Sequence, residues 1–398
     1  MTKFIRSPFS RRSFLHLAAS TAAAVPFMNE PMLAAAARMP VPYSALTKDA
    51  VMIDLNENPL GPCEAARKAI AAMIPQGGRY CDSLTEELIH SFAHLEGLGE
   101  DSFHLFPGST VPLHGSVIAY TSPQKSYVTA DPGYEAGMFA ASVVGARVVK
   151  VPLTKTYAHD AKAMVAAAPD AGLFYICSPN NPTGTLTPLA DIAYLVENKP
   201  KGSVVVVDEA YIHFTETPSA IDLVKAGKDI VVLRTLSKTY GMAGLRCGFA
   251  IGRPDLLAPI LDRSGDNFMP VPAVVAALAS LKDPQLVPER RRINASVRQE
   301  TFAWLDRNQY SYIPSQSNCF LLDTKRPGRE TIEAMAKQNV FVGRVWPTYP
   351  TYVRITVGTR DEMGRFQDAF QRVMTGAVAF SLGELNPAAR SGRVRLLS

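Results

Sequence analysis

Residues 230–246 read IVVLRTLSKTYGMAGLR, and this stretch decides how the fold is interpreted. It begins with a continuous apolar run and then turns polar, which is the pattern of a buried strand that ends at the edge of a sheet. A segment rich in Ser, Thr and Gly follows and contains one amine, Lys238. Open α/β sheets bind ligands at the carboxyl ends of their strands, so we expect Lys238 at a ligand-binding edge. A lone lysine in such a loop is more often only a solvent-exposed side chain, and the rest of the chain decides between these interpretations.

Two polar motifs follow other apolar strands. Residues 204–211 read VVVVDEAY, which puts Asp208 at the end of a buried strand. A carboxylate there is unfavourable unless a cation pairs with it, and a protonated pyridine nitrogen would be such a cation. Residues 178–184 read SPNNPTG, a rigid turn that can fix the side-chain amide of Asn181 against a ring substituent.

Two further motifs suit a flat, phosphorylated cofactor. Residues 107–110 read PGST and precede a predicted helix in which Thr110 caps and Pro112 lies in the first turn, so N–H groups remain for a phosphate. Residues 131–134 read DPGY and can lay the Tyr134 ring over a cofactor. Each motif has a structural alternative in a cap, a turn or core packing, but their joint occurrence favours a site for an aldehyde cofactor carried by the lysine.

Composition sets the class of protein. The 398 residues are 47% hydrophobic and 19% charged, which is enough for a large core and for two or three domains. The net charge is +5, and no Lys/Arg block beyond the first dozen residues suggests a nucleic-acid surface, so nucleic acid is not an expected partner. The five cysteines are scattered without a C-x-x-C pair, and we expect neither a disulfide framework nor a metal site.

Residues 1–37 have the layout of an export signal. The motif SRRSFL at 10–15 looks like a twin-arginine signal, and the apolar segment 15–27 is shorter than the roughly 20 residues of a membrane span. Four alanines at 34–37 offer a cleavage site. We therefore expect the twin-arginine export machinery as a partner and a periplasmic location, with a cytoplasmic protein carrying an N-terminal extension as the alternative.

Strand-like and helix-like segments alternate from about residue 50, which is typical of an α/β protein with a largely parallel sheet. The predicted strands of the large domain are 126–130, 146–153, 172–177, 204–208, 230–235 and 247–251. Longer helices follow residue 270, notably 289–308. The expected division is an N-terminal arm at 38–77, a large domain at 78–270, a smaller α/β domain at 271–376 and a basic tail at 377–398.

The chain resembles the fold-type-I pyridoxal-phosphate (PLP) aminotransferases, and among them the histidinol-phosphate aminotransferase family. The resemblance covers about residues 50–375. Its marks are LNENPLGP at 55–62, Arg79-Tyr80, SPNNPTG at 178–184, VDEAY at 207–211, the Lys238 segment, and VRITVG at 353–358. It implies a large domain with a mostly parallel, seven-stranded type of sheet flanked by helices, followed by a smaller α/β domain.

The resemblance also implies roles for individual residues. Lys238 would carry the cofactor and move a proton, Asp208 would pair with the ring nitrogen, Asn181 and Tyr211 would contact the ring oxygen, and Tyr134 would stack on the ring. The residues implied at the cofactor phosphate are Gly108, Ser109, Thr110, Ser237 and Arg246. Tyr80 would reach the cofactor phosphate from the neighbouring subunit, which implies a homodimer. The substrate-binding residues would be Arg354 for the α-carboxylate, Arg344 and Asn58.

The implied reaction transfers an amino group from an amino acid or an amino-alcohol phosphate to a 2-oxo acid such as 2-oxoglutarate. Arg344 could receive a substrate phosphate, whereas Trp346, Tyr349 and Tyr352 could form a pocket for an aromatic or aliphatic side chain. Periplasmic export disfavours a substrate of cytoplasmic histidine synthesis. The alternatives are a decarboxylase of the threonine-phosphate type, other PLP chemistry at the α-carbon, and a non-catalytic PLP- or amine-binding periplasmic protein.

Overall fold

The structure is a computed structural model that describes residues 47–265 and 268–376. The expected export signal and basic tail lie outside the described residues. Within the described ranges, no helix has both the length and the apolar character that a membrane crossing needs.

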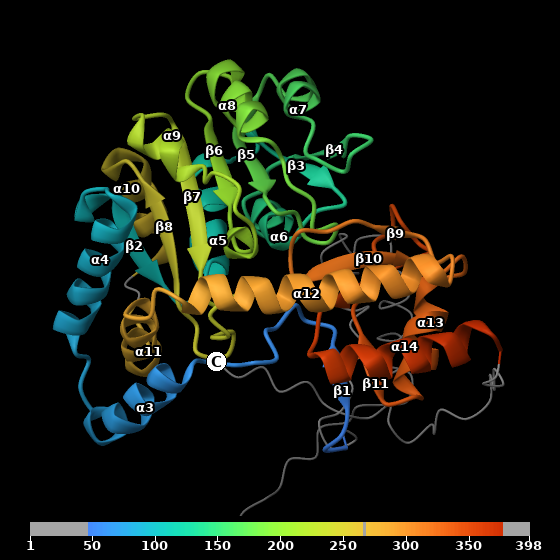
Figure 1. Ribbon diagram of the computed structural model, residues 1–398. Coiled ribbons are helices and arrows are strands. Elements are labelled where there is room, and N and C mark those ends of the chain that lie inside the picture. The colour runs from blue at the N-terminus through green and yellow to red at the C-terminus, as the bar shows by residue number, and fades with distance from the viewer. Residues whose placement is uncertain (1–46, 266–267, 377–398) are drawn as a thin grey trace, which may run out of the picture.

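A seven-stranded sheet forms the large domain (Figure 1). Its order is β2-β8-β7-β6-β5-β3-β4, and all neighbours are parallel except at β8, which runs antiparallel to β2 and β7. The strands are β2 (Phe103–Phe106), β3 (Ser126–Asp131), β4 (Val148–Pro152), β5 (Ala171–Cys177), β6 (Val204–Asp208), β7 (Ile230–Thr235) and β8 (Gly248–Gly252). The predicted mostly parallel sheet is confirmed.

Helices cover both faces of this sheet, which explains why its central strands are apolar throughout. In β6, Val205 and Val207 belong to one hydrophobic core, whereas Val204 and Val206 belong to the core on the opposite face. The second face is covered by α5 (Thr110–Tyr120), α6 (Ala136–Val143) and α10 (Pro254–Ser264). The first is covered by α3 (Glu64–Met73), α4 (Asp82–Glu96), α7 (Ala161–Ala167), α8 (Leu189–Asn198), α9 (Ile221–Lys225) and α11 (Val271–Leu281). Short 3-10 turns lie at Ile74–Gln76, Glu100–Ser102 and Ile212–Phe214.

The small domain contains two smaller sheets. One is antiparallel, in the order β12-β10-β9, and the other is a parallel pair of β1 and β11. Their bounds are β1 (Val51–Ile53), β9 (Tyr312–Ile313), β10 (Cys319–Asp323), β11 (Val340–Val342) and β12 (Tyr352–Thr356), with α13 (Gly328–Ala336) and α14 (Arg360–Met374) packed beside them. Strand β1, from the predicted N-terminal arm, is therefore part of the small domain's structure, whereas α3 of the same arm packs in the large domain.

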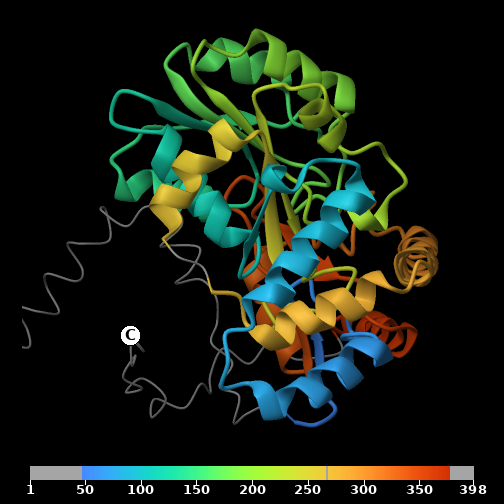
Figure 2. The same cartoon turned by 90° about the vertical axis from the view of Figure 1, so that its left-hand side faces the viewer.

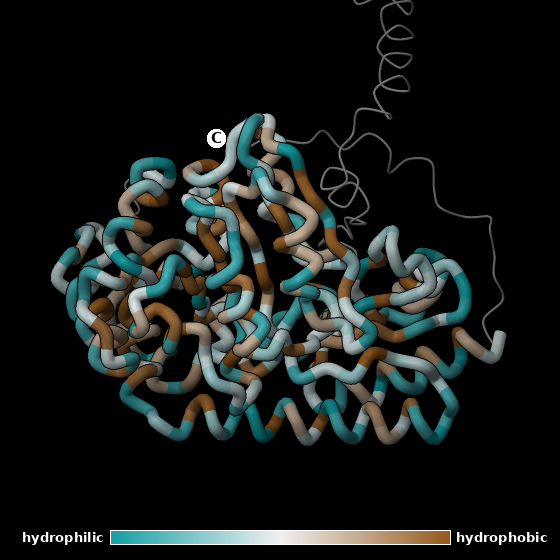
Figure 3. The backbone as a smooth tube through the Cα atoms, turned by 90° about the horizontal axis from the view of Figure 1, so that it is seen from above, coloured by the Kyte–Doolittle hydropathy of each residue, from teal (hydrophilic) through white to brown (hydrophobic). Residues whose placement is uncertain are grey.

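Helix α12 (Leu286–Arg307) runs across both domains in Figure 1. In Figure 3 it alternates between hydrophilic and hydrophobic residues along its length, as expected of a surface helix with one buried face. Figure 2 shows α3, α4 and α11 together on one side of the large domain. Ala66 of α3 and Ala273 of α11 both belong to the large-domain core. Helix α11 therefore packs in the large domain, and the chain passes to the small domain only along α12. The predicted division at residue 270 lies before both helices.

Candidate active site

Four neighbouring strands of the large sheet deliver the predicted residues to one edge. In the order β7, β6, β5 and β3, their carboxyl ends lead into Lys238, Asp208, Asn181 and Tyr134. This is the edge at which open α/β sheets bind ligands. The sequence expectation that Lys238 lies at such an edge agrees with this arrangement.

Asp208 is a buried carboxylate whose hydrogen-bond partners are uncharged. The Tyr175 hydroxyl donates to Oδ2 at 3.0 Å, and the Ala210 backbone N–H donates to Oδ1 at 3.1 Å. Burial raises the pKa of Asp208 to about 6, because two neutral donors only partly replace the lost hydration. The arrangement suits a ligand that brings its own positive charge to this carboxylate.

Lys238 is a half-buried amine just after the carboxyl end of β7. Its Nζ donates to the Leu55 carbonyl at 3.3 Å and lies 5.7 Å from the centre of the Tyr211 ring. Burial, and then the positive charge of Arg354, lower the pKa of Lys238 to about 8. About a tenth of the amine is therefore the neutral nucleophile at pH 7, far more than for an ordinary lysine.

The turn that follows Lys238 is held by two side chains. The Thr239 carbonyl accepts from Nδ2 of Asn58 at 2.9 Å and from Nη1 of Arg290 at 3.0 Å. Asn58, predicted to bind substrate, thus points its amide at the lysine turn, and its contact with substrate stays a prediction. Sequence reasoning missed Arg290, because nothing in the pattern of α12 distinguishes it from the helix's exposed arginines.

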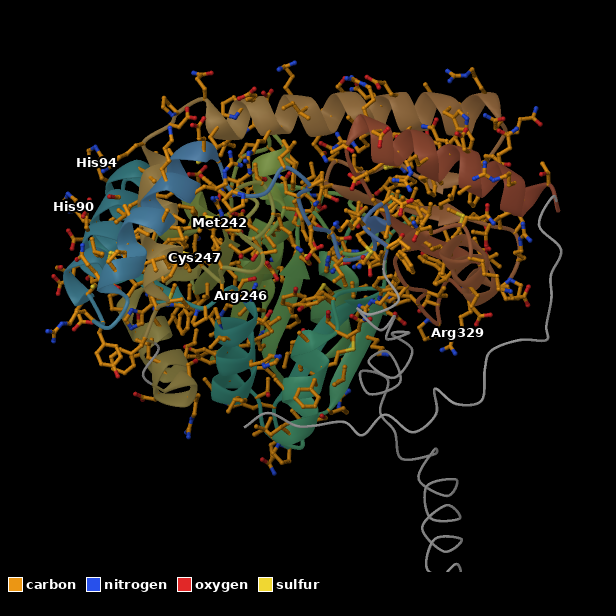
Figure 4. The ribbon with its side chains drawn as sticks, turned by 90° about the horizontal axis from the view of Figure 1, so that it is seen from below. His90, His94, Met242, Arg246, Cys247 and Arg329 are labelled. Carbon is orange, nitrogen blue, oxygen red and sulfur yellow. The ribbon has the colours of Figure 1, made fainter. Side chains whose placement is uncertain are left out.

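The predicted phosphate residues form a cradle at the start of α5. Gly108 has φ +85°, and a Cβ there would lie 2.1 Å from Nη2 of Arg246, so a side chain would strain the backbone and push the guanidinium aside. Nη1 of Arg246 donates to the Ser237 hydroxyl at 3.3 Å. In Figure 4 Arg246 lies in the interior, near Met242 and Cys247. The Thr110 cap prediction is wrong: Ser109 holds the N-cap position without a capping side-chain bond, and Thr110 is the first helical residue.

A second cluster links the large and small domains beside Lys238. Nη1 of Arg354 donates to Oδ1 of Asn181 at 2.9 Å, and its Nη2 donates to the Asp54 carbonyl at 2.6 Å. The guanidinium Nε is buried without a hydrogen-bond partner, which fits an anionic ligand. The Tyr211 hydroxyl accepts from Nδ2 of Asn56 at 3.0 Å.

Arg344 does not stand free in this structure. Its guanidinium forms an ion pair with the carboxylate of Glu135, and both side chains are largely buried. The Arg344 guanidinium also lies 4.4 Å from the Trp346 ring centre, and Arg354 lies 5.6 Å from the same ring. Sequence reasoning missed Glu135, because its partner lies 209 residues away.

Tyr80 lies on the surface of the chain. It is 71% exposed, and its ring centre lies 4.7 Å from that of Phe268, which is also exposed. His90 and His94 of the neighbouring α4 lie at the outer edge of the molecule in Figure 4. Two exposed aromatic rings in contact are unusual for a surface that faces only water.

Proteins of similar sequence identify the family of this chain. The family model described as aminotransferase class I and II matches residues 48–370. The chain belongs to this family. A histidinol-phosphate aminotransferase from Symbiobacterium thermophilum is 36% identical to this aminotransferase over 330 residues, 82% of this chain and 91% of the relative. An aromatic amino acid aminotransferase from Cutibacterium acnes is 31% identical over 333 residues, 83% of this chain and 94% of the relative.

A solved structure shares the fold. The histidinol-phosphate aminotransferase from Sinorhizobium meliloti, in complex with pyridoxal-5'-phosphate, matches with a TM-score of 0.72 at 24% identity, over 82% of this chain and 91% of that chain. This aminotransferase is therefore a PLP-dependent enzyme of fold type I.

The residues present fit PLP. Asp208 would hold the ring nitrogen, because it lacks a cationic hydrogen-bond partner. The start of α5, where the Arg246 guanidinium lies directly against Gly108 and Ser109 holds the N-cap position without a capping side-chain bond, suits the phosphate. Lys238 would hold the aldehyde, since burial and Arg354 favour its neutral amine. Tyr134, whose hydroxyl lies 3.5 Å from that of Thr110, would lie against the ring.

Proposed function

We propose that this aminotransferase takes an amino group from an α-amino acid and passes it to a 2-oxo acid, with Lys238 as proton carrier and Arg354 as carboxylate-binding residue. The observation that carries the proposal is that both residues donate to neighbouring carbonyls of one short segment. Nζ of Lys238 donates to the Leu55 carbonyl at 3.3 Å and Nη2 of Arg354 donates to the Asp54 carbonyl at 2.6 Å, while Nε of Arg354 is buried without a hydrogen-bond partner. An α-carboxylate bound to Arg354 would bring its α-carbon close to the amine.

Each residue then has a defined task. Bound PLP supplies an aldehyde that takes up the amino group and a ring that accepts the electron pair left at the α-carbon. Lys238 removes the proton from the α-carbon as a general base and later returns a proton as a general acid. Asp208 stabilises a proton on the ring nitrogen. Arg354, held by Asn181 and the Asp54 carbonyl, orients the substrate.

The two classes of relative named above differ in substrate. The name of one specifies a phosphorylated amino alcohol, histidinol phosphate, and the name of the other specifies aromatic amino acids. Trp346, Tyr349 and Tyr352 belong to one small apolar cluster near Arg344. These aromatic side chains support a donor with an apolar side chain.

A single-turnover experiment tests the proposal. Purified PLP-loaded protein is mixed with a panel of amino acids, and conversion of the cofactor to pyridoxamine phosphate is followed by absorbance. We expect conversion with at least one donor, and its loss in Lys238→Ala but not in the surface control Lys228→Ala, whose amine pairs with Glu197. Release of carbon dioxide without pyridoxamine phosphate would replace transamination by decarboxylation, and no spectral response to any donor would favour the non-catalytic alternative.

We also propose a homodimer in which Tyr80 enters the neighbouring subunit's site. The exposed Tyr80–Phe268 pair supports this, since a partner would cover both rings. Sedimentation of the wild type should give twice the chain mass of 43.1 kDa, and Tyr80→Ser should weaken PLP binding. A monomeric wild type at micromolar concentration would contradict the proposal.

We further propose export by the twin-arginine route, supported by the motif at 10–15. Replacing Arg11 and Arg12 by lysine should leave the protein in the cytoplasmic fraction of a host with that machinery. Equal periplasmic recovery of both forms would refute it.

A further inference from the structure

Two arginines of the small domain approach the site described above, and they differ in the charge of the groups to which they donate. Arg354 donates to an amide oxygen and a backbone carbonyl, both uncharged. Arg344 pairs with the carboxylate of Glu135. The Arg344–Glu135 pair is largely buried, with side-chain exposures of 15% and 12%, so water screens it little.

One indole ring fixes this arrangement. Trp346 contacts both guanidinium groups, since that of Arg344 lies 4.4 Å and that of Arg354 lies 5.6 Å from its ring centre. Its Nε1 donates to the Gly133 carbonyl at 3.1 Å. Gly133 lies two residues before Glu135, so the indole also ties down the segment that supplies the carboxylate. Trp346 therefore contacts Arg344 with its ring and binds the segment that carries Glu135 through its Nε1.

The pair belongs to the substrate site rather than to the outer surface. Arg344 and Glu135 are among the charges that shift the pKa of Arg354, in opposite directions. They also act on Tyr134, the residue next to Glu135 in the chain. A ligand bound to Arg354 would thus feel both charges of the pair.

We propose that Glu135 is a specificity-determining residue, which leaves one free positive charge for substrate and so selects donors and acceptors whose only anionic group is the α-carboxylate. This inference rests on the proposed function. A phosphate, or a second carboxylate as in glutamate and 2-oxoglutarate, would have to displace Glu135 from Arg344 or lie beside it uncompensated. An amino acid with an uncharged side chain meets neither obstacle, and the neighbouring aromatic residues suit an aromatic one.

The experiment compares kcat/KM for L-phenylalanine, L-glutamate and histidinol phosphate in the PLP-loaded wild type and in Glu135→Gln. The wild type should prefer phenylalanine. Glu135→Gln frees the charge of Arg344 and should raise kcat/KM for both anionic donors by about tenfold or more, because the repulsion by Glu135 is removed, with phenylalanine changed less than about threefold. Glu135→Asp, which keeps the charge, should behave as the wild type. Glu216→Gln, which neutralises the carboxylate of a separate surface pair with Arg291, should change nothing.

A binding measurement separates failure of this inference from failure of the proposed function. The chain has two tryptophans, so Trp304→Phe leaves Trp346 as the single fluorescent indole beside Arg344. Inorganic phosphate should quench it at about tenfold lower concentration in Glu135→Gln than in its parent, whether or not any donor reacts. Equal affinities, an equal gain for all three donors, or a wild type that prefers glutamate or histidinol phosphate would overturn the inference.

Discussion

The buried carboxylate of Asp208 gives a prediction that can be tested without a substrate. In the PLP-free protein its pKa rises from 3.8 to about 6 through burial. A pKa raised in the folded state means that the folded protein binds this proton more tightly than the unfolded chain. Stability is therefore lost as pH rises from about 4 to about 6, and the loss is complete above the folded pKa. The shift corresponds to about 3 kcal/mol.

The matched variant is Asp208→Asn, which removes the charge and preserves the hydrogen bonds. Its Oδ1 can accept from the Ala210 N–H, and its amide can donate to the Tyr175 hydroxyl. The measurement is the free energy of unfolding of PLP-free protein in urea at pH values of about 4 and about 8. The wild type should lose about 3 kcal/mol relative to the variant between these conditions.

Other carboxylates titrate equally in both proteins, so the difference isolates Asp208. Adding PLP should remove the pH dependence, because the ring nitrogen brings the missing positive charge. A wild-type-minus-variant difference that stays constant within about 1 kcal/mol, or that grows with pH, would refute the reasoning.

Three further predictions concern the same edge of the sheet. The amine of Lys238 in PLP-free protein should react with an acylating reagent with a midpoint at about pH 8, whereas a midpoint near the ordinary 10.5 would contradict its burial beside Arg354. Gly108→Ala should weaken PLP binding in equilibrium dialysis by about tenfold or more, since its Cβ would collide with Arg246; unchanged affinity would show that the cradle adjusts. Arg290→Met should reduce kcat about tenfold while PLP affinity stays within about twofold, because the lysine turn loses a charged donor.

The sheet was predictable because its central strands are buried on both faces. Such strands are short continuous apolar runs, and the predicted ranges 204–208 and 230–235 match β6 and β7 residue for residue. The residues after them were predictable because strand ends fix where the following loop begins. Less regular boundaries were missed: the predicted strand 146–153 shortens to Val148–Pro152 in β4.

The contacts between distant segments were not predictable. The pairing of Glu135 with Arg344, and of Arg290 with the Thr239 carbonyl, depends on how the small domain and α12 lie against the large sheet. Periodicity reports which face of an element is buried, but not which polar group of another element will meet it. The N-cap of α5 was predicted at Thr110, one residue after the observed Ser109, because Ser and Thr are both favoured at that position.

The short segment from Asp54 to Asn58 has a consequence for how the protein can be processed. Its carbonyls accept from Lys238 and Arg354, and its asparagines hold the Tyr211 hydroxyl and the Thr239 carbonyl. Just before it, β1 is bonded into the small domain. Any peptidase that trims the N-terminus must therefore stop before residue 51. A cut only a few residues further would leave a folded sheet whose lysine, arginine and tyrosine had lost the strap that brings them to one place.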